Sequence, residues 1–404
     1  MCTAVQETAA TAGGRYCFVM TKLAEAPQSE SVASHRCEAH FEICSPWQDV
    51  PYGEQLRRKQ QRLVDLYAEI EDGLPELPSI MDDFRASPSR LGYRTKMEFS
   101  FTNGESNDEP LRLAFHKRGR RYDMEPLPLG CSLAGDAANA VALDVVDRLR
   151  AEGVAACQLK SVVIREAKRT GEIVAALYVR DEEFPAEILA NLSGTRGSVV
   201  IYSRPNTPAS VLTRVLATSG TPDLTEEVAG LRLRYAHDGF FQINVPVFEQ
   251  AVRDLAAHVQ PTGTILELYS GVGAIGLQLA ERAERVLGFE LNAPAVACAR
   301  QNALQNDIGN YEAFAMSAQQ IHADTLSAPR ALVLDPPREG LAPKVVQRLV
   351  KARPARILYL SCNPATQARD YAQLSSTYRP AYLAGYDFFP HTPHIESLLV
   401  LEAR

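Results

Sequence analysis

The chain has 404 residues, more than one hydrophobic core usually serves, and we expect two domains. Apolar residues make up 46% of it and charged residues 23%, as in a globular protein, and no window approaches the roughly 18 uncharged apolar residues of a membrane span. The net charge of -7 argues against indiscriminate binding to polyanions, and the absence of a signal-peptide pattern leads us to expect a cytoplasmic protein without disulfides.

Residues 1–36 are rich in alanine, threonine, serine and glutamate, and no apolar period is sustained there. Such a composition does not support a core, so we expect a poorly ordered leader. Cys37 and Cys44 follow, with His40 between them. Two cysteines beside a histidine suggest a metal site, although two ligands alone do not make one.

Residues 52–72 have the pattern of a helix, because apolar residues recur on one face. Further along the chain, apolar residues recur at every second position. Residues 97–101 and 111–115 therefore predict a half-buried antiparallel pair of strands. A pair of this kind leaves one face for solvent or a ligand.

The following part mixes helices and strands. We expect helices at 137–151 and near 186–192, and strands at 161–165, 173–179 and 198–202. This mixture indicates an α+β domain, which we expect to span residues 37–225 and to end near a linker at 219–223.

Basic residues gather in three places in this domain, all before residue 175. Such charge runs more often mark solvated strand faces than binding sites, but their asymmetric placement favours RNA binding by the N-terminal half. The three clusters are Arg90, Arg94 and Lys96; the acid-free segment 112–121; and Lys160, Arg165, Lys168 and Arg169.

Residues 226–404 alternate regularly between strands and helices. Strands are expected at 264–268, 285–289, 330–334 and 356–360, with helices between and after them. This alternation predicts an α/β architecture in which a doubly wound, Rossmann-like parallel sheet follows the N-terminal α+β domain.

A glycine-rich turn follows the first of these strands, at Gly271, Gly273 and Gly276. It lets the backbone approach a ligand at the start of a helix, and Glu290, which ends the next strand, is placed to accept hydrogen bonds from a ribose. These features fit a nucleoside cofactor, either a dinucleotide or S-adenosyl-L-methionine. Asp335 and the two prolines after it form a rigid crevice edge with few free amides, which favours S-adenosyl-L-methionine.

Cys362 stands where the strand at 356–360 has ended and Asn363-Pro364 breaks the chain. Because ligands of parallel sheets lie beyond the carboxyl ends of the strands, we expect this thiol to face a crevice as a nucleophile. The alternative is an inert buried thiol.

Five motifs together resemble the bacterial RNA uracil-5-methyltransferases that act on tRNA and 23S rRNA. The resemblance covers about residues 37–404, and it implies that Cys362 is the nucleophile and Glu396 the base. It also implies that the cofactor is held by Gln242, Tyr269, Glu290 and Asp335, beside Gly271 and Gly273. The motifs are Phe241-Gln242-Ile-Asn244, Gly271-Val-Gly273, Asp335-Pro-Pro-Arg338, Ser361-Cys362-Asn-Pro and His394-Ile-Glu396-Ser397.

The sequence departs from this family at two positions and leaves a metal site open. Ala274 stands where the family usually has asparagine, and Met316 stands near the position of an aspartate; both bear on cofactor affinity. Many members also hold a [4Fe-4S] cluster. Cys37, Cys44 and Cys131 resemble three of its four ligands, and Cys17 is a candidate for the fourth.

The resemblance implies transfer of a methyl group from S-adenosyl-L-methionine to C5 of a uridine in structured RNA, tRNA or 23S rRNA. Carbon 5 of uracil is a poor nucleophile, and addition of the Cys362 thiolate to C6 would activate it. A desolvated Glu396 beside Phe388 and Phe389 suits removal of the C5 proton, and Arg338 is a candidate for orienting the base. We expect the protein to act as a monomer.

Three other readings stay open. Ala274 and Met316 are compatible with a noncatalytic RNA-binding protein on a degenerate methyltransferase fold. An RNA cytosine-5-methyltransferase uses the same chemistry but would carry a further cysteine beside Asp335, which this chain lacks. The pairing of Cys362 with Glu396 disfavours an NAD-dependent oxidoreductase.

Overall fold

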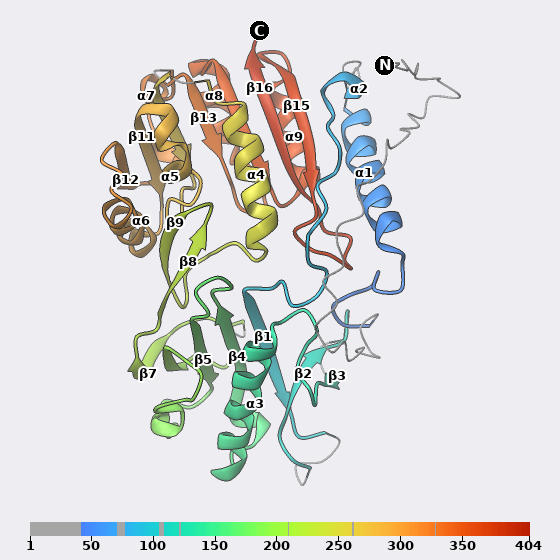
Figure 1. Ribbon diagram of the computed structural model, residues 1–404, viewed down its shortest axis with the longest axis vertical. Coiled ribbons are helices and arrows are strands. Elements are labelled where there is room, and N and C mark those ends of the chain that lie inside the picture. The colour runs from blue at the N-terminus through green and yellow to red at the C-terminus, as the bar shows by residue number, and fades with distance from the viewer. Residues whose placement is uncertain are drawn as a thin grey trace, which may run out of the picture.

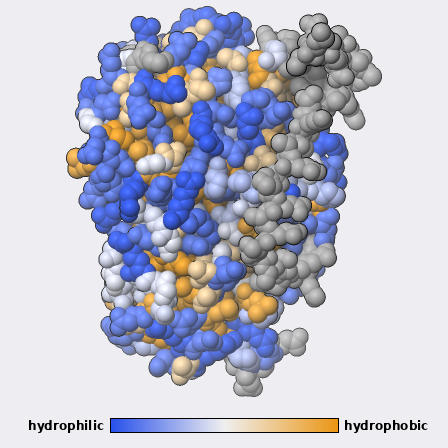
Figure 2. All heavy atoms as spheres, in the orientation of Figure 1, coloured by the Kyte–Doolittle hydropathy of each residue, from blue (hydrophilic) through white to orange (hydrophobic). Residues whose placement is uncertain are grey.

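The computed structural model describes residues 42–70, 77–104, 109–120, 123–208, 210–260, 262–327 and 329–404. The leader expected at 1–36, and Cys17 and Cys37, lie outside these ranges. The described residues form two seven-stranded sheets and a hairpin, and Figure 1 shows the two sheets one above the other along the long axis. None of the described helices is long and apolar enough to cross a membrane. On the face seen in Figure 2, hydrophilic residues cover most of the surface.

The C-terminal sheet confirms the expected α/β architecture. Its strand order is β12-β11-β10-β13-β14-β16-β15, and the first five strands are parallel. The order reverses between β10 and β13, and ligands of such sheets bind at the carboxyl ends of the strands beside a reversal. The strands are β10 (Thr262–Leu268), β11 (Ala283–Glu290), β12 (Tyr311–Ala315), β13 (Ala331–Leu334), β14 (Arg356–Ser361), β15 (Tyr378–Tyr386) and β16 (Glu396–Ala403).

Helices cover both faces of this sheet because its strands are apolar on both sides. Along β13, Leu332 and Leu334 belong to one core, whereas Val333 belongs to the other. Such a continuous apolar run is typical of a buried parallel strand. The helices are α4 (Val245–Ala257), α5 (Gly276–Leu279), α6 (Ala293–Gln305), α7 (Ala323–Ser327), α8 (Pro343–Ala352) and α9 (Pro364–Leu374), with 3-10 turns η3 (Ala280–Arg282) and η4 (Ala318–Gln320).

The central sheet has the order β3-β2-β1-β4-β5-β6-β7, and helix α3 packs against it. The predicted antiparallel pair is present as β1 and β2, in which Phe101 pairs with Leu113. A hairpin, β8–β9, follows this sheet and packs against α6. The elements are β1 (Lys96–Thr102), β2 (Arg112–His116), β3 (Met124–Pro126), α3 (Asp136–Ala151), η1 (Ala156–Gln158), β4 (Leu159–Glu166), β5 (Ile173–Val179), η2 (Ala186–Leu189), β6 (Gly197–Tyr202), β7 (Arg214–Gly220), β8 (Asp223–Val228) and β9 (Leu231–Ala236).

Helix α1 (Tyr52–Ala68) precedes the central sheet in the chain but packs against α9 and β15 of the C-terminal sheet. Its buried residues Leu63, Val64 and Tyr67 share a core with that sheet, and Figure 1 shows the helix beside β15. The next helix, α2 (Leu77–Ile80), also contacts β15. The N-terminal part of the chain therefore contributes to both bodies, and the division at residues 225 and 226 stays a prediction.

The antiparallel hairpin β15–β16 is not among the elements predicted from the sequence. It joins the edge of the parallel strands, where β14 pairs with β16 from Arg356 opposite Glu402 to Ser361 opposite Ser397. This register brings the beginning of β16 to the carboxyl end of β14.

Candidate active site

The turn after β10 has an unusual backbone. Tyr269 has a φ of 63°, Gly271 one of 53° and Gly273 one of 82°, all in the left-handed region. A Cβ at Gly273 would lie 3.0 Å from the Tyr311 hydroxyl and 3.1 Å from a methyl of Leu277, so only glycine fits there without displacement. A left-handed tyrosine is uncommon outside functional turns, and it gives this turn a fixed shape at the head of α5.

Glu290, at the end of β11, holds the same turn. Its carboxylate accepts hydrogen bonds from the Gly271 amide at 3.1 Å and the Asn292 amide at 2.8 Å. Each carboxylate oxygen has two lone pairs, so both can accept a further hydrogen bond from a ligand hydroxyl. This geometry is compatible with the predicted contact to a ribose.

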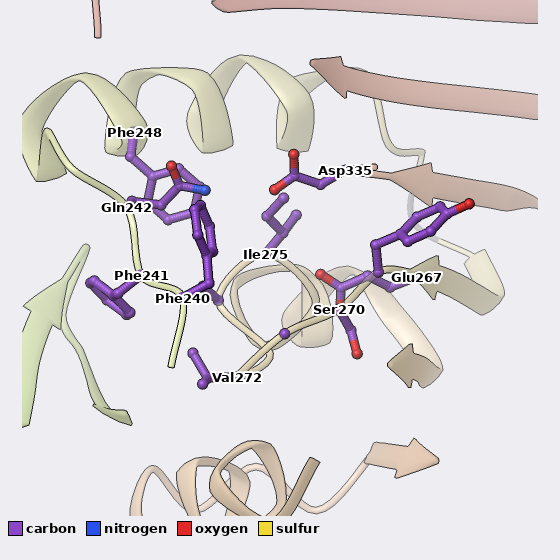
Figure 3. Close-up of a pocket in the computed structure, with 12 residues that line it drawn as sticks. Phe240, Phe241, Gln242, Phe248, Glu267, Ser270, Val272, Ile275 and Asp335 are labelled. Atoms are coloured by element: carbon purple, nitrogen blue, oxygen red, sulfur yellow. The ribbon is translucent and has the colours of Figure 1, made fainter. Parts of the chain in front are cut away.

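A pocket lies in front of the turn, with Gln242 on one side and Asp335 on the other, and Figure 3 shows these two side chains pointing toward one another above Ile275. Gln242 reaches it from the segment after β9, which is fixed to the start of β1: the Thr95 hydroxyl donates to the Gln242 carbonyl at 2.8 Å. The pocket is lined by Phe240, Phe241, Gln242, Phe248, Glu267, Tyr269, Ser270, Gly271, Val272, Ala274, Ile275 and Asp335.

Acidic groups crowd this pocket. Burial raises the pKa of Glu267 to about 8, and the nearby Asp335 and Glu290 carboxylates add to the effect. Burial likewise raises the pKa of Asp335 to about 7. Because a nearby cation stabilises ionised carboxylates, the pocket favours a positively charged ligand, and a sulfonium nucleoside carries such a charge.

The proposed nucleophile and base lie at one end of two paired strands. Ser361 of β14 is paired with Ser397 of β16, and Cys362 and Glu396 are the next residues beyond that pair. Burial and the nearby Glu396 and Asp335 carboxylates raise the pKa of the Cys362 thiol to about 11, whereas contact with the Arg338 guanidinium lowers it. Burial raises the pKa of Glu396 well above its ordinary value, and Asp335 raises it further.

Arg338 connects the loop after β13 to both of these residues. Its carbonyl accepts hydrogen bonds from the Asn363 amide group at 2.9 Å and the Thr366 hydroxyl at 3.2 Å, which fixes the turn that carries Cys362. Its guanidinium lies 3.4 Å from Nδ1 of His394. Burial, followed by the charges of Arg338 and Lys59, lowers the pKa of His394 to about 4, so this imidazole is neutral at pH 7.

The two departures from the family pattern both lie near the turn. Ala274 lines the pocket itself. Met316 is 38% exposed, and its backbone amide donates to the Glu290 carbonyl at 2.9 Å. A side chain at position 316 is therefore close to the proposed ribose contact.

Several cations of the predicted RNA-binding clusters have partners within the protein. Nζ of Lys160 is surrounded by oxygens of the 203–208 loop, including the Ser203 hydroxyl at 3.0 Å and the Arg204 carbonyl at 2.6 Å. Arg165 is buried and donates to the Gly239 carbonyl, and Arg169 pairs with Glu249 at 2.6 Å. These three contacts fix loops rather than leave a charged surface.

Cys44 and Cys131 come together although they are distant in sequence. The two thiols are hydrogen-bonded, and this contact and burial raise the pKa of Cys131 well above its ordinary value. Cys37 lies outside the described residues. Among the described residues, no group of three or more His, Cys, Asp or Glu side chains could hold a metal ion.

Sequence reasoning did not single out Lys59 or Asp387. Their side chains form an ion pair of 2.5 Å in which both are fully buried, beside the connection that leads into Glu396. A signal was present, because Lys59 lies three residues after Leu56 and four before Leu63, within the apolar face of α1.

The fold is a doubly wound α/β fold with an acidic pocket at the carboxyl ends of its parallel strands. The family model for tRNA (Uracil-5-)-methyltransferase matches residues 51–404, and the chain belongs to this family. It is accordingly an RNA (uracil-5-)-methyltransferase.

Two relatives agree with this assignment, and a solved structure shares the fold. An uncharacterized RNA methyltransferase of Nitratidesulfovibrio vulgaris is 30% identical, with 90% of this chain and 82% of the relative covered, and one of Clostridium tetani is 29% identical, with 88% and 81% covered. The fold is similar to that of the Pyrococcus abyssi tRNA (uracil-54, C5)-methyltransferase in complex with S-adenosyl-L-homocysteine. The TM-score is 0.71 and the identity 24%, and the match covers 88% of this chain and 84% of the other.

Proposed function

We propose that the chain methylates C5 of one uridine in a structured RNA, tRNA or 23S rRNA, through a covalent bond between Cys362 and C6. The observation that supports this most strongly is the placement of Cys362 and Glu396 directly beyond the Ser361–Ser397 pair. A nucleophile and a base at one crevice, beside an acidic nucleoside pocket, are the groups that this reaction needs.

The Cys362 thiolate attacks C6, and the electrons of the C5=C6 bond move toward O4 to give an enolate. S-adenosyl-L-methionine, when bound, would supply an electrophilic methyl group on a cationic sulfur. C5 of the enolate takes this methyl group as the sulfur–methyl bond breaks, and the electrons of that bond stay on the sulfur as a neutral thioether. Glu396 then takes the C5 proton. The electrons of the C5–H bond restore the C5=C6 bond, the C6–S bond breaks, and the thiolate of Cys362 is released.

Charge in the crevice controls the first step. Glu396 and Asp335 oppose ionisation of the thiol, and Arg338 favours it. A cationic ligand near Asp335 acts in the same direction as Arg338, which couples formation of the nucleophile to occupation of the pocket. The residues proposed to hold the cofactor are Gln242, Tyr269, Gly271, Gly273, Glu290 and Asp335.

Two variants test this proposal. Cys362→Ala is expected to lose methyl transfer while still binding S-adenosylmethionine, and measurable turnover in it would exclude the covalent step. Glu396→Gln is expected to accumulate a covalent RNA adduct on denaturing gels. A turnover near that of the wild type, without an adduct, would assign the base to another residue.

The target is proposed as a class only, tRNA or 23S rRNA. The uridine has to leave its stack to reach the crevice, since neither face of a stacked ring is open to Cys362. Mass mapping of 5-methyluridine in both RNAs from a deletion strain identifies the target. If both RNAs of the deletion strain keep all their 5-methyluridine, this assignment is contradicted.

A noncatalytic RNA-binding role has one observation in its favour, the residues Ala274 and Met316 next to the pocket. Cofactor titration separates it from the enzyme. Calorimetric binding of S-adenosylmethionine in the micromolar range supports methyl transfer, and no binding at millimolar cofactor would support the noncatalytic role.

We also propose that Cys37, Cys44 and Cys131 hold an iron–sulfur cluster, with Cys17 as the fourth ligand. The support is the contact between the Cys44 and Cys131 thiols. Anaerobic purification, an absorbance spectrum and iron analysis test it, and protein without iron or a visible band would contradict it.

The protein is further proposed to be cytoplasmic. It is also proposed to work as a monomer, because one chain carries every residue that the reaction is proposed to use. Light scattering at micromolar concentration tests this, and a dimer mass would contradict it.

A further inference from the structure

One face of α1 holds the connection between β15 and β16. Tyr52, Gln55 and Lys59 are spaced by three and four residues, so their side chains lie on the same side of the helix. The connection begins at Asp387 and ends where Glu396 opens β16. Helix α1 is far from this segment in sequence, and Figure 1 shows it beside β15.

Lys59 makes the central contacts between α1 and this connection. Its ammonium lies 2.5 Å from Oδ1 of Asp387 and donates to the Phe389 carbonyl at 3.0 Å. The other oxygen of Asp387 accepts from the Tyr52 hydroxyl at 2.8 Å. The side chains of Lys59 and Asp387 are both 0% exposed, so neither is solvated by water.

Gln55 and Arg62 hold the later part of the connection. The His391 amide donates to Oε1 of Gln55 at 2.9 Å, and the Arg62 guanidinium donates to the Pro393 carbonyl at 3.2 Å. Ile395, directly before Glu396, packs with Leu56 of α1 and with Phe84. The helix therefore contacts the connection from its first residue to its last.

A buried ion pair is a poor way to increase stability, because an apolar pair of similar volume often serves as well or better. Its directional bonds do restrict position more than apolar contact does. The pair here fixes the backbone at Asp387 and Phe389, and the connection then leads to the carboxylate proposed to remove the C5 proton. None of these residues takes part in the chemical steps themselves.

We propose that Lys59 is a positioning residue for the reaction: through Asp387 and the Phe389 carbonyl it fixes the β15–β16 connection, so that Glu396 reaches the C5 proton of the bound uridine. This inference rests on the proposed role of Glu396. Loss of the Lys59 contacts leaves Cys362, directly after β14, undisturbed, so formation of the covalent adduct continues while its breakdown slows.

The test uses the full-length enzyme, an RNA that it methylates and S-adenosylmethionine. Lys59→Met is compared with the double variant Lys59→Met/Asp387→Asn, in which no unpaired charge is left in the interior. The matched control is Arg57→Gln, on the exposed side of the same helix, where Arg57 is 60% exposed and pairs with Glu54. Circular dichroism establishes that each variant is folded, and denaturing gels measure the fraction of enzyme bound to RNA.

The expected result is a steady-state adduct fraction about tenfold or more above that of the wild type and a kcat lower by about the same factor, because small displacements of a catalytic group cost this much or more. KM for S-adenosylmethionine stays unchanged, and Arg57→Gln behaves like the wild type. If Lys59→Met does not fold, the double variant decides the question.

Two results would overturn the inference. One is a folded variant with wild-type kcat and adduct fraction. The other is a fall in kcat without an adduct, which is what a merely structural role produces. Glu396→Gln, measured in parallel, separates the two proposals: an adduct in this variant but not in the Lys59 variants contradicts only the role of Lys59, whereas an adduct in none of them contradicts the role of Glu396.

Discussion

Cys362 and Glu396 are the first residues beyond the last pair, Ser361 and Ser397, that joins β14 to β16. Two antiparallel strands that end together place their next side chains at the same edge of a sheet. The edge here is also the carboxyl end of β13, where Asp335 faces the pocket. The thiol and the carboxylate that we propose as nucleophile and base thus lie near Asp335, which lines the pocket.

The first prediction concerns the pH dependence of the Cys362 thiol. Its pKa is raised to about 11 in the ligand-free protein, so the neutral thiol prevails at pH 7 and the reactive thiolate increases as pH rises. Alkylation of Cys362 by iodoacetamide should accelerate about tenfold per pH unit between pH 7 and 10.

Mass spectrometry of the Cys362 peptide measures this rate, and the exposed Cys157 provides an internal comparison. Arg338→Met should slow the reaction at each pH, because Arg338 lowers the pKa of the thiol. A rate that reaches its plateau below pH 9 would show that the thiol ionises more readily than we expect.

The second prediction concerns Glu267, whose pKa is raised from 4.5 to about 8 by burial. Because the folded state holds this proton more tightly than the unfolded state, folding loses stability as pH rises from about 4.5 to about 8. Glu267→Gln removes that loss. The variant should be more stable than the wild type at pH 8, by roughly 4 kcal/mol, and should lose most of this advantage toward pH 5.

Urea unfolding at pH 5, 6, 7 and 8 checks the difference. The amide oxygen of the variant can still accept from the Gly276 amide, as Glu267 does at 3.1 Å, so the turn is retained. A stability difference that does not change with pH would mean that Glu267 does not titrate in this range.

The third prediction concerns Glu290. Glu290→Gln replaces a charged acceptor by a neutral one at the Gly271 amide and at the proposed ribose contact. Hydrogen bonds to charged groups contribute about 1.5–3 kcal/mol, so affinity for S-adenosylmethionine should fall by about tenfold or more. Isothermal calorimetry measures it.

Met316→Asp is the matched variant, expected to change cofactor affinity in the opposite direction. It restores, close to the same ligand, the residue type that is usual in the family. It should tighten cofactor binding. Unchanged affinity in both variants would show that the cofactor does not bind at the end of β11.

The fourth prediction concerns stability rather than catalysis. Lys59→Met leaves Asp387 as an unpaired buried charge, and loss of one partner of such a pair costs about 3–5 kcal/mol. The double variant Lys59→Met/Asp387→Asn should recover part of this loss. Urea titration of both measures the free energy of unfolding, and a loss below about 1 kcal/mol in the single variant would show that Asp387 finds another partner or solvent.

The strand ends were predictable from local pattern, and the register between distant segments was not. The prolines after Asp335 and Asn363 mark where β13 and β14 stop, and the glycine turn after β10 is local in the same way. The position of Glu396 depends instead on the antiparallel pairing of β16 with β14, which no local pattern specifies.

The surroundings of the basic residues were likewise not predictable from local sequence. The sequence pattern predicts that Lys160 and Arg165 lie on the surface, but both donate to carbonyls of other segments, at Arg204 and Gly239. Lys59 stands among Arg57, Arg58 and Arg62, and this basic run conceals its place in the apolar face of the helix. Long-range contacts decide whether such a cation is exposed or buried.

The most direct test of the central claim uses RNA in which 5-fluorouridine replaces uridine. A C5 fluorine cannot be removed as a proton, so the reaction should stop at the covalent stage after methyl transfer. The wild-type enzyme, incubated with this RNA and S-adenosylmethionine, is digested and its cross-linked peptide sequenced by mass spectrometry. We predict one methylated nucleotide attached to Cys362; a cross-link at another cysteine, or methylation without any cross-link, would contradict the covalent mechanism.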